Sequence, residues 1–187
     1  FFSTPFDIET VDFLEKIKVK MYKVASFDIS NFQLLKKIVS TKKPTIISTG
    51  MATINEIKKT YNLFKNNKVD LAILHCISSY PNKDETSYLS NIRYLKEKFN
   101  CTIGFSDHTN DIKTSIYSSL LGAEIIEKHF MSSIKSNCVD SLVSIDPNKF
   151  KQMKKEIDNL KKIVSKPKFG FRPEEKKYLI FKRNKIL

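Results

Sequence analysis

The sequence predicts an α/β protein and, within that class, a (β/α)8 TIM barrel of which the 187-residue chain carries strands 3–8. Three observations lead to this prediction. Six short runs rich in Val, Ile and Phe alternate with amphipathic helical stretches, which indicates a parallel sheet covered by helices. Hydroxyl groups, acids or histidines end each run, as in barrels whose active sites lie at the strand ends. The GxGxxG fingerprint of a dinucleotide-binding open sheet is absent.

The six predicted strands follow one another with room for a helix between them. They are FFSTPF at 1–6, YKVASFDI at 22–29, PTIISTG at 44–50, LAILHCISSYP at 71–81, CTIGFSDHT at 101–109 and AEIIEKHF at 123–130. Six units fall short of the eight that close a barrel, and the chain opens without Met inside the first predicted strand. We therefore expect a fragment that lacks the first two units.

Sequence signals also predict where helices begin. The capping-box pattern occurs at 30–33 and 53–56, which makes Ser30 and Thr53 predicted N-caps. Asp146 precedes a proline that suits the first turn of a helix. Apolar residues then recur at helical spacing in two sets: Ile54, Ile57, Tyr61 and Phe64, and Phe150, Met153, Ile157, Leu160 and Val164.

The composition argues against several classes of protein. No run approaches the length of a membrane span, and the first ten residues lack the basic start and the cleavage site of a signal peptide. The net charge of +13 is mostly Lys spread over predicted helix faces, with only three arginines for contacts to a phosphate backbone. Cys76, Cys101 and Cys138 show no CxxC spacing and read as reduced thiols. We expect a cytoplasmic protein that binds neither nucleic acid nor membrane.

Two of the three histidines end neighbouring predicted strands. Residues two apart in a strand point the same way, so Glu127 shares a face with His129, and Ser106 shares one with His108, while Asp107 lies opposite. If these faces look into the mouth of a barrel, the two imidazoles meet with a carboxylate beside them. Such a set suits Mn²⁺, Zn²⁺ or Fe²⁺. A lone histidine is more often a hydrogen-bonded core residue, but a matched pair favours a metal site.

Other strand ends suit an anion. The STG run at 48–50 directly precedes the helix capped by Thr53 and offers hydroxyls and free N–H groups at a positive helix end. Lys23, in the strand that leads to Ser26, can pair with a phosphate or a carboxylate. Further hydroxyls end other strands, at Thr4, Ser78, Ser79 and Ser106. Together these residues suggest a phosphorylated small substrate beside a cation.

Six ordered motifs carry a family resemblance: STPFD, YKVAS, STGMAT, HCISSYP, GFSDHT and EKHF. They resemble the N-acetylneuraminate (sialic acid) synthase family, which includes pseudaminate and legionaminate synthases, over essentially the whole chain. The resemblance implies a TIM barrel that condenses phosphoenolpyruvate with an N-acylated hexosamine, either N-acetylmannosamine or a diacetamido-dideoxyhexose. The products are a nonulosonic (sialic-type) acid and phosphate. ASFDI resembles the pseudaminate type and the tail resembles legionaminate-like members, so the acceptor sugar stays open.

The resemblance also implies residue roles. His108 and His129 are the implied metal ligands, for Mn²⁺ or alternatively Mg²⁺ or Co²⁺, and are catalytic together with Glu127 and Lys23. The implied substrate-binding residues are Thr4, Lys23, Ser26, Ser48, Gly50, Ser79, Tyr80, Ser106, Asp107 and Asp140. His75 is expected instead to pack or to form a hydrogen bond inside its strand.

The same resemblance sets expectations for the ends of the chain. It implies a partial synthase domain at 1–165 and, at 166–187, a linker toward a missing C-terminal antifreeze-like (SAF) domain. In the family that domain reaches into the partner's active site in a domain-swapped homodimer. The family also takes an acid and a lysine from the first two strands. A six-unit sheet exposes two edges, so we expect the isolated chain to be inactive and prone to association.

Two alternatives remain open on the sequence. The first is another barrel chemistry, such as a Schiff-base aldolase that uses the Lys23 amine. The second is a non-catalytic basic binding protein, for which a salt-sensitive affinity for nucleic acid would be the distinguishing result.

Overall fold

Five parallel strands form one sheet in the order β1-β2-β3-β4-β5. The computed structural model describes residues 1–133 and 138–183. Within these ranges the strands are β1 (Tyr22–Val24), β2 (Thr45–Ser48), β3 (Leu71–Cys76), β4 (Thr102–Asp107) and β5 (Ile125–Lys128). The α-helices are α1 (Ile8–Lys16), α2 (Phe32–Ser40), α3 (Ile54–Asn66), α4 (Ser90–Lys98), α5 (Lys113–Leu120) and α6 (Pro147–Ile163). Short 3-10 helices span Ser26–Asp28, Asp84–Thr86, Ser141–Val143 and Pro173–Phe181.

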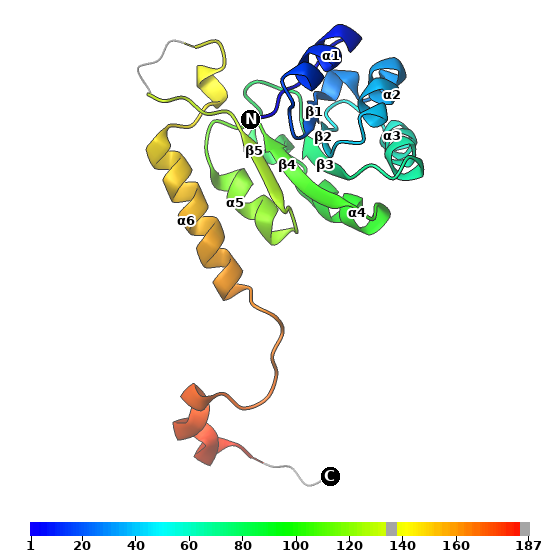
Figure 1. Ribbon diagram of the computed structural model, residues 1–187. Helices are drawn as coiled ribbons and strands as arrows, with labels where there is room; N and C mark the ends of the chain where they lie inside the picture. Colours follow the sequence, from blue (N-terminus) through cyan, green and yellow to red (C-terminus); the bar gives the residue numbers. More distant parts are fainter. Residues whose placement is uncertain (134–137, 184–187) are drawn as a thin grey trace.

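The sheet is curled into a half-barrel. Lys23 on β1 and Glu127 on β5 belong to the two edge strands, yet Lys23 Nζ lies 3.6 Å from Glu127 Oε1. In a flat sheet the backbones of the first and fifth strands would be roughly 19 Å apart, because neighbouring strands are spaced by about 4.8 Å. The α-helices lie around the outside of this arc (Figure 1). The predicted α/β class with a parallel, helix-covered sheet is therefore confirmed.

Alternation along the strands divides the apolar residues between two faces. The main core lies between the helices and the outer face, where Ile47, Ile73 and Phe105 meet helix residues such as Leu35 and Phe64. The inner face carries a smaller cluster: Ile46, Ala72 and Leu74, with Met21 and Ile125 packed against them. The core thus forms outside the arc, and the inner face near the strand ends is left for polar residues.

The first predicted strand differs from the structure. Residues 1–6 form no regular strand, and Ser3 makes a single parallel bridge to Tyr22. The reason is local: Pro5 has no N–H to donate, and the Asp7 carboxylate accepts from the Thr10 N–H as the N-cap of α1. The chain turns into a helix before a ladder can extend.

The structure confirms two of the three predicted helix starts. Thr53 forms a reciprocal capping box at α3, and Asp146 caps α6 ahead of Pro147. The prediction for Ser30 is wrong, because α2 begins one residue later and the Asn31 side chain accepts from the Leu34 N–H. The Ser30 hydroxyl donates instead to Glu56 of the α3 capping box, at 3.1 Å.

The two predicted apolar helix faces are covered to different degrees. On α3, Ile57, Tyr61 and Phe64 are buried. On α6, Met153 is buried in a cluster with Ile112 and Ile145 of the body. Other members of the α6 face stay exposed, including Phe150 and Val164.

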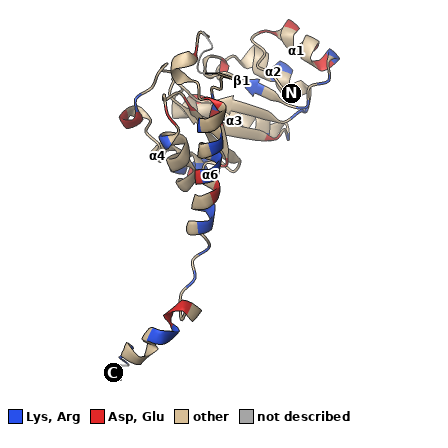
Figure 2. Cartoon of the chain, turned by 90° about the vertical axis from the view of Figure 1, so that its left-hand side faces the viewer, with Lys and Arg blue, Asp and Glu red and all other residues tan. Residues whose placement is uncertain are grey.

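The C-terminal segment leaves the body after α6 and contains the 3-10 helix at Pro173–Phe181 (Figure 1). Residues 184–187 of the predicted linker lie outside the described residues. Lys and Arg are spread along α6 and this segment as well as over the body (Figure 2). In the described part of the chain, no helix combines the length and the apolar character needed to cross a membrane.

Candidate active site

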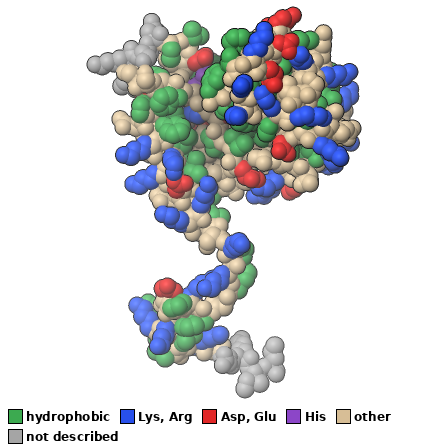
Figure 3. Space-filling view, in the orientation of Figure 1, with side chains coloured by type: hydrophobic (Ala, Val, Ile, Leu, Met, Phe, Trp, Pro, Cys, Tyr) green, Lys and Arg blue, Asp and Glu red, His purple; other side chains and the backbone are tan. Residues whose placement is uncertain are grey.

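A small cavity of about 100 Å³ opens at the carboxyl ends of the strands, on the inner side of the arc. Residues from all five strands or from the loops that follow them line it. They are Lys23, Ala25, Ser26, Phe27, Ser48, Cys76, Ser78, Tyr80, Ser106, His108, Glu127 and His129. In the space-filling view, histidine surface is visible in a hollow of the body (Figure 3). The position is the one expected for a barrel active site.

His108 and His129 are brought together at the ends of β4 and β5. Their ring centroids are 5.5 Å apart. His108 Nδ1 donates to the Ile77 carbonyl at 2.8 Å, and His129 Nδ1 lies 3.6 Å from Asp140 Oδ2. Because each Nδ1 faces an oxygen, Nε2 is the ring nitrogen left to bind a cation. Tyr80 stacks on His108 at 4.0 Å between ring centroids and restricts that ring further.

Both imidazoles are held in the neutral form that ligates metals. Burial lowers the pKa of His108 below its usual 6.5. Burial also lowers the pKa of His129, and the neighbouring His108 acts in the same direction. At neutral pH each ring therefore keeps a lone pair available.

Lys23 and Glu127 form the polar centre of the cavity. Lys23 Nζ donates to Ser48 Oγ at 2.7 Å and to the Val24 carbonyl at 3.0 Å. Ser106 Oγ donates to Glu127 Oε1 at 2.7 Å. Burial lowers the pKa of the Lys23 ammonium, and the Glu127 carboxylate opposes that shift. An incoming anion would meet a cation already oriented by a hydroxyl and a carboxylate.

Gly50 lets the β2 and β3 ends approach each other closely. Its N–H donates to Ser26 Oγ at 3.0 Å. A Cβ at this position would lie 2.1 Å from Ser78 Oγ and 2.9 Å from Ser26 Oγ. Any larger residue would displace both hydroxyls from the cavity.

The two imidazoles suit one divalent cation. A ligating nitrogen lies about 2 Å from its metal, so rings whose centroids are 5.5 Å apart can reach the same ion. Within 1–133 and 138–183, no third His, Cys, Asp or Glu joins them in a metal-binding group. Such a site leaves coordination positions for water or for substrate oxygens.

Most of the predicted site residues converge on the cavity. Lys23, Ser26, Ser48, Tyr80, Ser106, His108, Glu127 and His129 line it. Gly50 and Asp140 are not among the lining residues, but each contacts one of them: the Gly50 N–H donates to Ser26, and the Asp140 carboxylate lies beside His129. Thr4 is half-buried beside the Ser3 bridge and is not among the lining residues.

Two predicted substrate-binding residues lie elsewhere. Ser79 is exposed and donates to the Pro81 carbonyl at 3.0 Å, whereas Ser78 lines the cavity. Asp107 points to the outer face and contacts Lys128, so the structure does not bring it to the site. For Asp107 the alternation of side chains along β4 decides the outcome, whereas Ser79 lies in the loop after β3.

The same alternation identifies residues that the sequence did not single out. Cys76 lies on the inner face two residues before Ser78, and its Sγ is 3.8 Å from His108 Nδ1. Counting by twos from Leu74 would have found it. His75, one position earlier, faces outward, stacks against Phe105 and contacts the Ser87 carbonyl at 2.7 Å. The expectation of a packing role for His75 is confirmed.

The fold and this site place the chain in a class: half-barrel α/β proteins with a histidine pair and a cavity lined by a lysine and hydroxyl groups at the strand ends. Comparison with known families is more specific. The model of the NeuB family matches residues 1–168, and the chain belongs to that family.

Similar proteins support this membership. The chain is 42% identical over 153 residues to pseudaminic acid synthase of Campylobacter jejuni serotype O:2, covering 81% of the chain and 45% of that protein. It is 36% identical over 167 residues to N,N'-diacetyllegionaminic acid synthase of the same strain, covering 88% and 50%. The crystal structure of N-acetylneuraminic acid synthetase from Leptospira borgpetersenii, in complex with citrate, superposes with a TM-score of 0.88 at 33% identity, covering 95% and 62%. The chain spans about half the length of the curated relatives it matches.

Proposed function

We propose that this chain supplies the phosphoenolpyruvate-binding and cation-binding part of a nonulosonic acid synthase. The reaction condenses phosphoenolpyruvate with the open-chain aldehyde of an N-acylated hexosamine and releases phosphate. The observation that carries the proposal is the cavity that holds Lys23 with its hydroxyl partners beside the pair His108 and His129. Membership of the NeuB family and the names of the relatives support it.

In this proposal, different residues of the cavity bind different parts of the substrates. Lys23 binds the phosphate or the carboxylate of phosphoenolpyruvate, with hydroxyls of Ser26, Ser48 and Ser106 around it. Glu127 accepts from Ser106 and lies near Lys23, so it orients both groups. Asp140 lies beside His129 at the open side of the cavity, where the sugar enters.

The enol carbon of phosphoenolpyruvate attacks the aldehyde carbon, and the aldehyde oxygen takes up a proton to become a hydroxyl. Water adds to the resulting oxocarbenium carbon and gives up one proton, which balances the proton taken up by the aldehyde oxygen. The new hydroxyl then passes its proton to the departing phosphate as the C–O bond breaks and the keto group forms. The products are the 2-keto acid and inorganic phosphate. His108 and His129 would hold a divalent cation, Mn²⁺ before Mg²⁺ or Co²⁺, which supplies Lewis-acid polarisation of the aldehyde when bound.

The proposal extends to the whole protein. The five strands and the bridged segment at 1–6 correspond to strands 3–8 of an eight-fold barrel, with residues 1–165 as its partial domain and 166–187 as a linker toward an antifreeze-like domain. The whole protein forms a domain-swapped homodimer in the cytoplasm. The free thiols of Cys76, Cys101 and Cys138 are compatible with a reducing compartment.

Phosphate release tests the proposal. The protein, at the full length of its relatives, is incubated with phosphoenolpyruvate, Mn²⁺ and a panel of N-acetylmannosamine and diacetamido-hexoses. We expect release that requires one sugar, the metal and His108, and that is lost in His108→Ala but kept in His75→Gln, a histidine outside the cavity. A folded protein that binds Mn²⁺ and releases no phosphate with any sugar would contradict the proposed reaction.

A second candidate is favoured by one observation. Burial lowers the pKa of Lys23, as a Schiff-base amine requires. Borohydride trapping of a carbonyl substrate on Lys23 would support an aldolase, and a strict requirement for Mn²⁺ would exclude it.

A further inference from the structure

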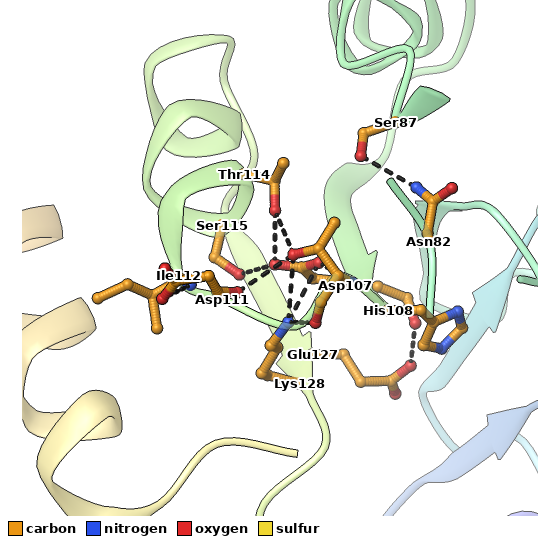
Figure 4. A network of polar contacts seen from close by, with 12 residues as sticks. Asn82, Ser87, Asp107, His108, Asp111, Ile112, Thr114, Ser115, Glu127 and Lys128 are labelled. Carbon is orange, nitrogen blue, oxygen red and sulfur yellow. Dashed lines mark hydrogen bonds and ion pairs between the residues drawn. The ribbon is translucent and has the colours of Figure 1, made fainter. Parts of the chain in front are cut away.

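A second cluster of charged and polar side chains lies behind the cavity, on the outer face of β4 and β5. It consists of Asp107 and Lys128 with Thr114 and Ser115 of α5 (Figure 4). Thr109, which precedes α5, belongs to the same cluster through its contact with Thr114. Lys128 Nζ and Asp107 Oδ1 are 3.3 Å apart, and their side chains are 1% and 0% exposed. Neither charge can reach a substrate, and the proposed reaction uses neither.

The register of the two strands relates this cluster to the cavity. Asp107 pairs directly with Lys128, one step after Ser106 pairs with Glu127. Each charged residue is the last of its strand, immediately precedes a histidine and points to the face opposite that histidine. The ion pair is the last paired step of the sheet before both imidazoles.

The contacts of this pair also hold the chain that follows His108. Asp107 accepts from the Thr109 N–H at 2.8 Å, and from the hydroxyls of Thr114 at 2.9 Å and of Ser115. Lys128 Nζ donates to the Thr109 carbonyl. One ion pair thus joins the end of β4, the end of β5 and the first turn of α5, so His108 is fixed from both sides.

A buried pair of this kind selects one register. If β5 slipped by one residue against β4, the Lys128 ammonium would leave Asp107, and each buried charge would lose its partner. Burial already lowers the pKa of Lys128, with Asp107 opposing the shift. Apolar residues of similar size in place of Asp107 and Lys128 could stabilise the sheet as well, but they would not favour one register over another.

We propose that the Asp107–Lys128 pair is a positioning device that holds His108 and His129 at the separation at which they share one cation. The inference rests on the cation site proposed above. It assigns a role to Asp107 that differs from the substrate contact predicted by resemblance.

The test compares Asp107→Asn with the parent protein at full natural length, using two measurements. The first is the imidazole ¹⁵N–¹H spectrum of the metal-free protein, in which His75 is an internal reference because it faces away from the cavity. We expect the ring signals of His108 and His129 to shift or broaden while those of His75 stay in place. The second is Mn²⁺ affinity by electron paramagnetic resonance, which we expect to weaken roughly 10- to 100-fold.

The control is Ile38→Ala, in which a fully buried residue of α2 is truncated away from the cavity. It lowers the melting temperature but should leave all three imidazoles and the Mn²⁺ affinity unchanged. If Asp107→Asn does not fold, Ser115→Ala and Thr114→Val each remove one hydroxyl from Asp107 and keep the ion pair.

The outcomes separate this inference from the proposed function. Unchanged signals of His108 and His129 with Mn²⁺ affinity within twofold of the parent would overturn the positioning role. An equal change at His75 would overturn it too, because that would show general loosening. A parent protein that binds no Mn²⁺ would refute the proposed cation site, and the metal-free spectra would then decide whether the pair positions the two rings.

Discussion

At the scale of single residues, side-chain alternation explains both the successes and the failures of the sequence prediction. Glu127 and His129 share the inner face as predicted, and Lys23 meets them there from β1. Ser79 and Asp107 were assigned to the site by motif, yet β4 directs Asp107 to the outer face, and Ser79 lies in the loop after β3, where it bonds to the Pro81 carbonyl. Motif membership locates a site along the chain, whereas the direction of each side chain depends on the strand that carries it.

Ser78 lines the cavity and Ser79 does not, which predicts different effects of substituting the two residues. If Ser78 binds phosphoenolpyruvate in the proposed reaction, Ser78→Ala should raise the KM for it roughly 10- to 150-fold, because a hydrogen bond to a charged group contributes about 1.5–3 kcal/mol. Ser79→Ala is the matched variant, one residue away, exposed and bonded only locally. Steady-state kinetics on both variants provide the check; a larger effect at Ser79 would restore the prediction made by resemblance.

His75 gives a prediction about pH. Burial lowers its pKa below 6.5, as it does for His108 and His129. The unfolded chain therefore takes up protons near pH 6.5 that the folded chain refuses, so the free energy of unfolding should fall as the pH drops below about 6.5. In His75→Gln this slope should become shallower between pH 6.5 and 5. Urea titrations of the two proteins at several pH values measure it, and equal slopes would show that His75 does not contribute.

At the scale of elements, the order of strands and helices was predictable because periodicity and caps are local properties. The exceptions also have local causes. Pro5 ends the first predicted strand, and Asn31 replaces Ser30 as the cap of α2 because it accepts from Leu34. Two adjacent residues with similar capping ability cannot be ranked from sequence when one of them finds a partner on another helix, as Ser30 does in Glu56.

The corrected cap can be tested by a pair of substitutions. Asn31→Ala should lower the free energy of unfolding by about 1 kcal/mol, as expected for the loss of an N-cap. Ser30→Ala should cost less, because it removes only an exposed hydrogen bond to Glu56. Urea unfolding followed by circular dichroism gives both values. A larger loss in Ser30→Ala would return the cap to the residue that the pattern first indicated.

At the scale of the whole molecule, the curl of the sheet was the feature least accessible from sequence. It results from the summed twist of five strands and not from any one of them. The resemblance to barrel proteins supplied the expectation, and the contact between β1 and β5 provides the evidence.

The surface of the 187-residue chain predicts its behaviour in solution. Among the described residues, no regular strand pairs with the outer edge of β1 or of β5; each edge has only one isolated bridge nearby, from Ser3 to Tyr22 and from Ile145 to Phe130. Large apolar side chains are also exposed on α6 and beyond it, including Ile163, Phe169 and Ile180. We expect the chain expressed alone to associate as its concentration rises. Sedimentation velocity over a hundredfold concentration range tests this, and a single monomeric species throughout would contradict it.

The contact between Lys23 and Glu127 also has a consequence for the order of folding. About a hundred residues of chain separate the two, and closing a loop of that length costs roughly 1 kcal/mol more entropy than closing one of about 25 residues. Neighbouring strands, each followed by its own helix, pair over much shorter separations. The cavity at the strand ends should therefore be among the last parts of the molecule to form during refolding, after the helices and the outer core are in place.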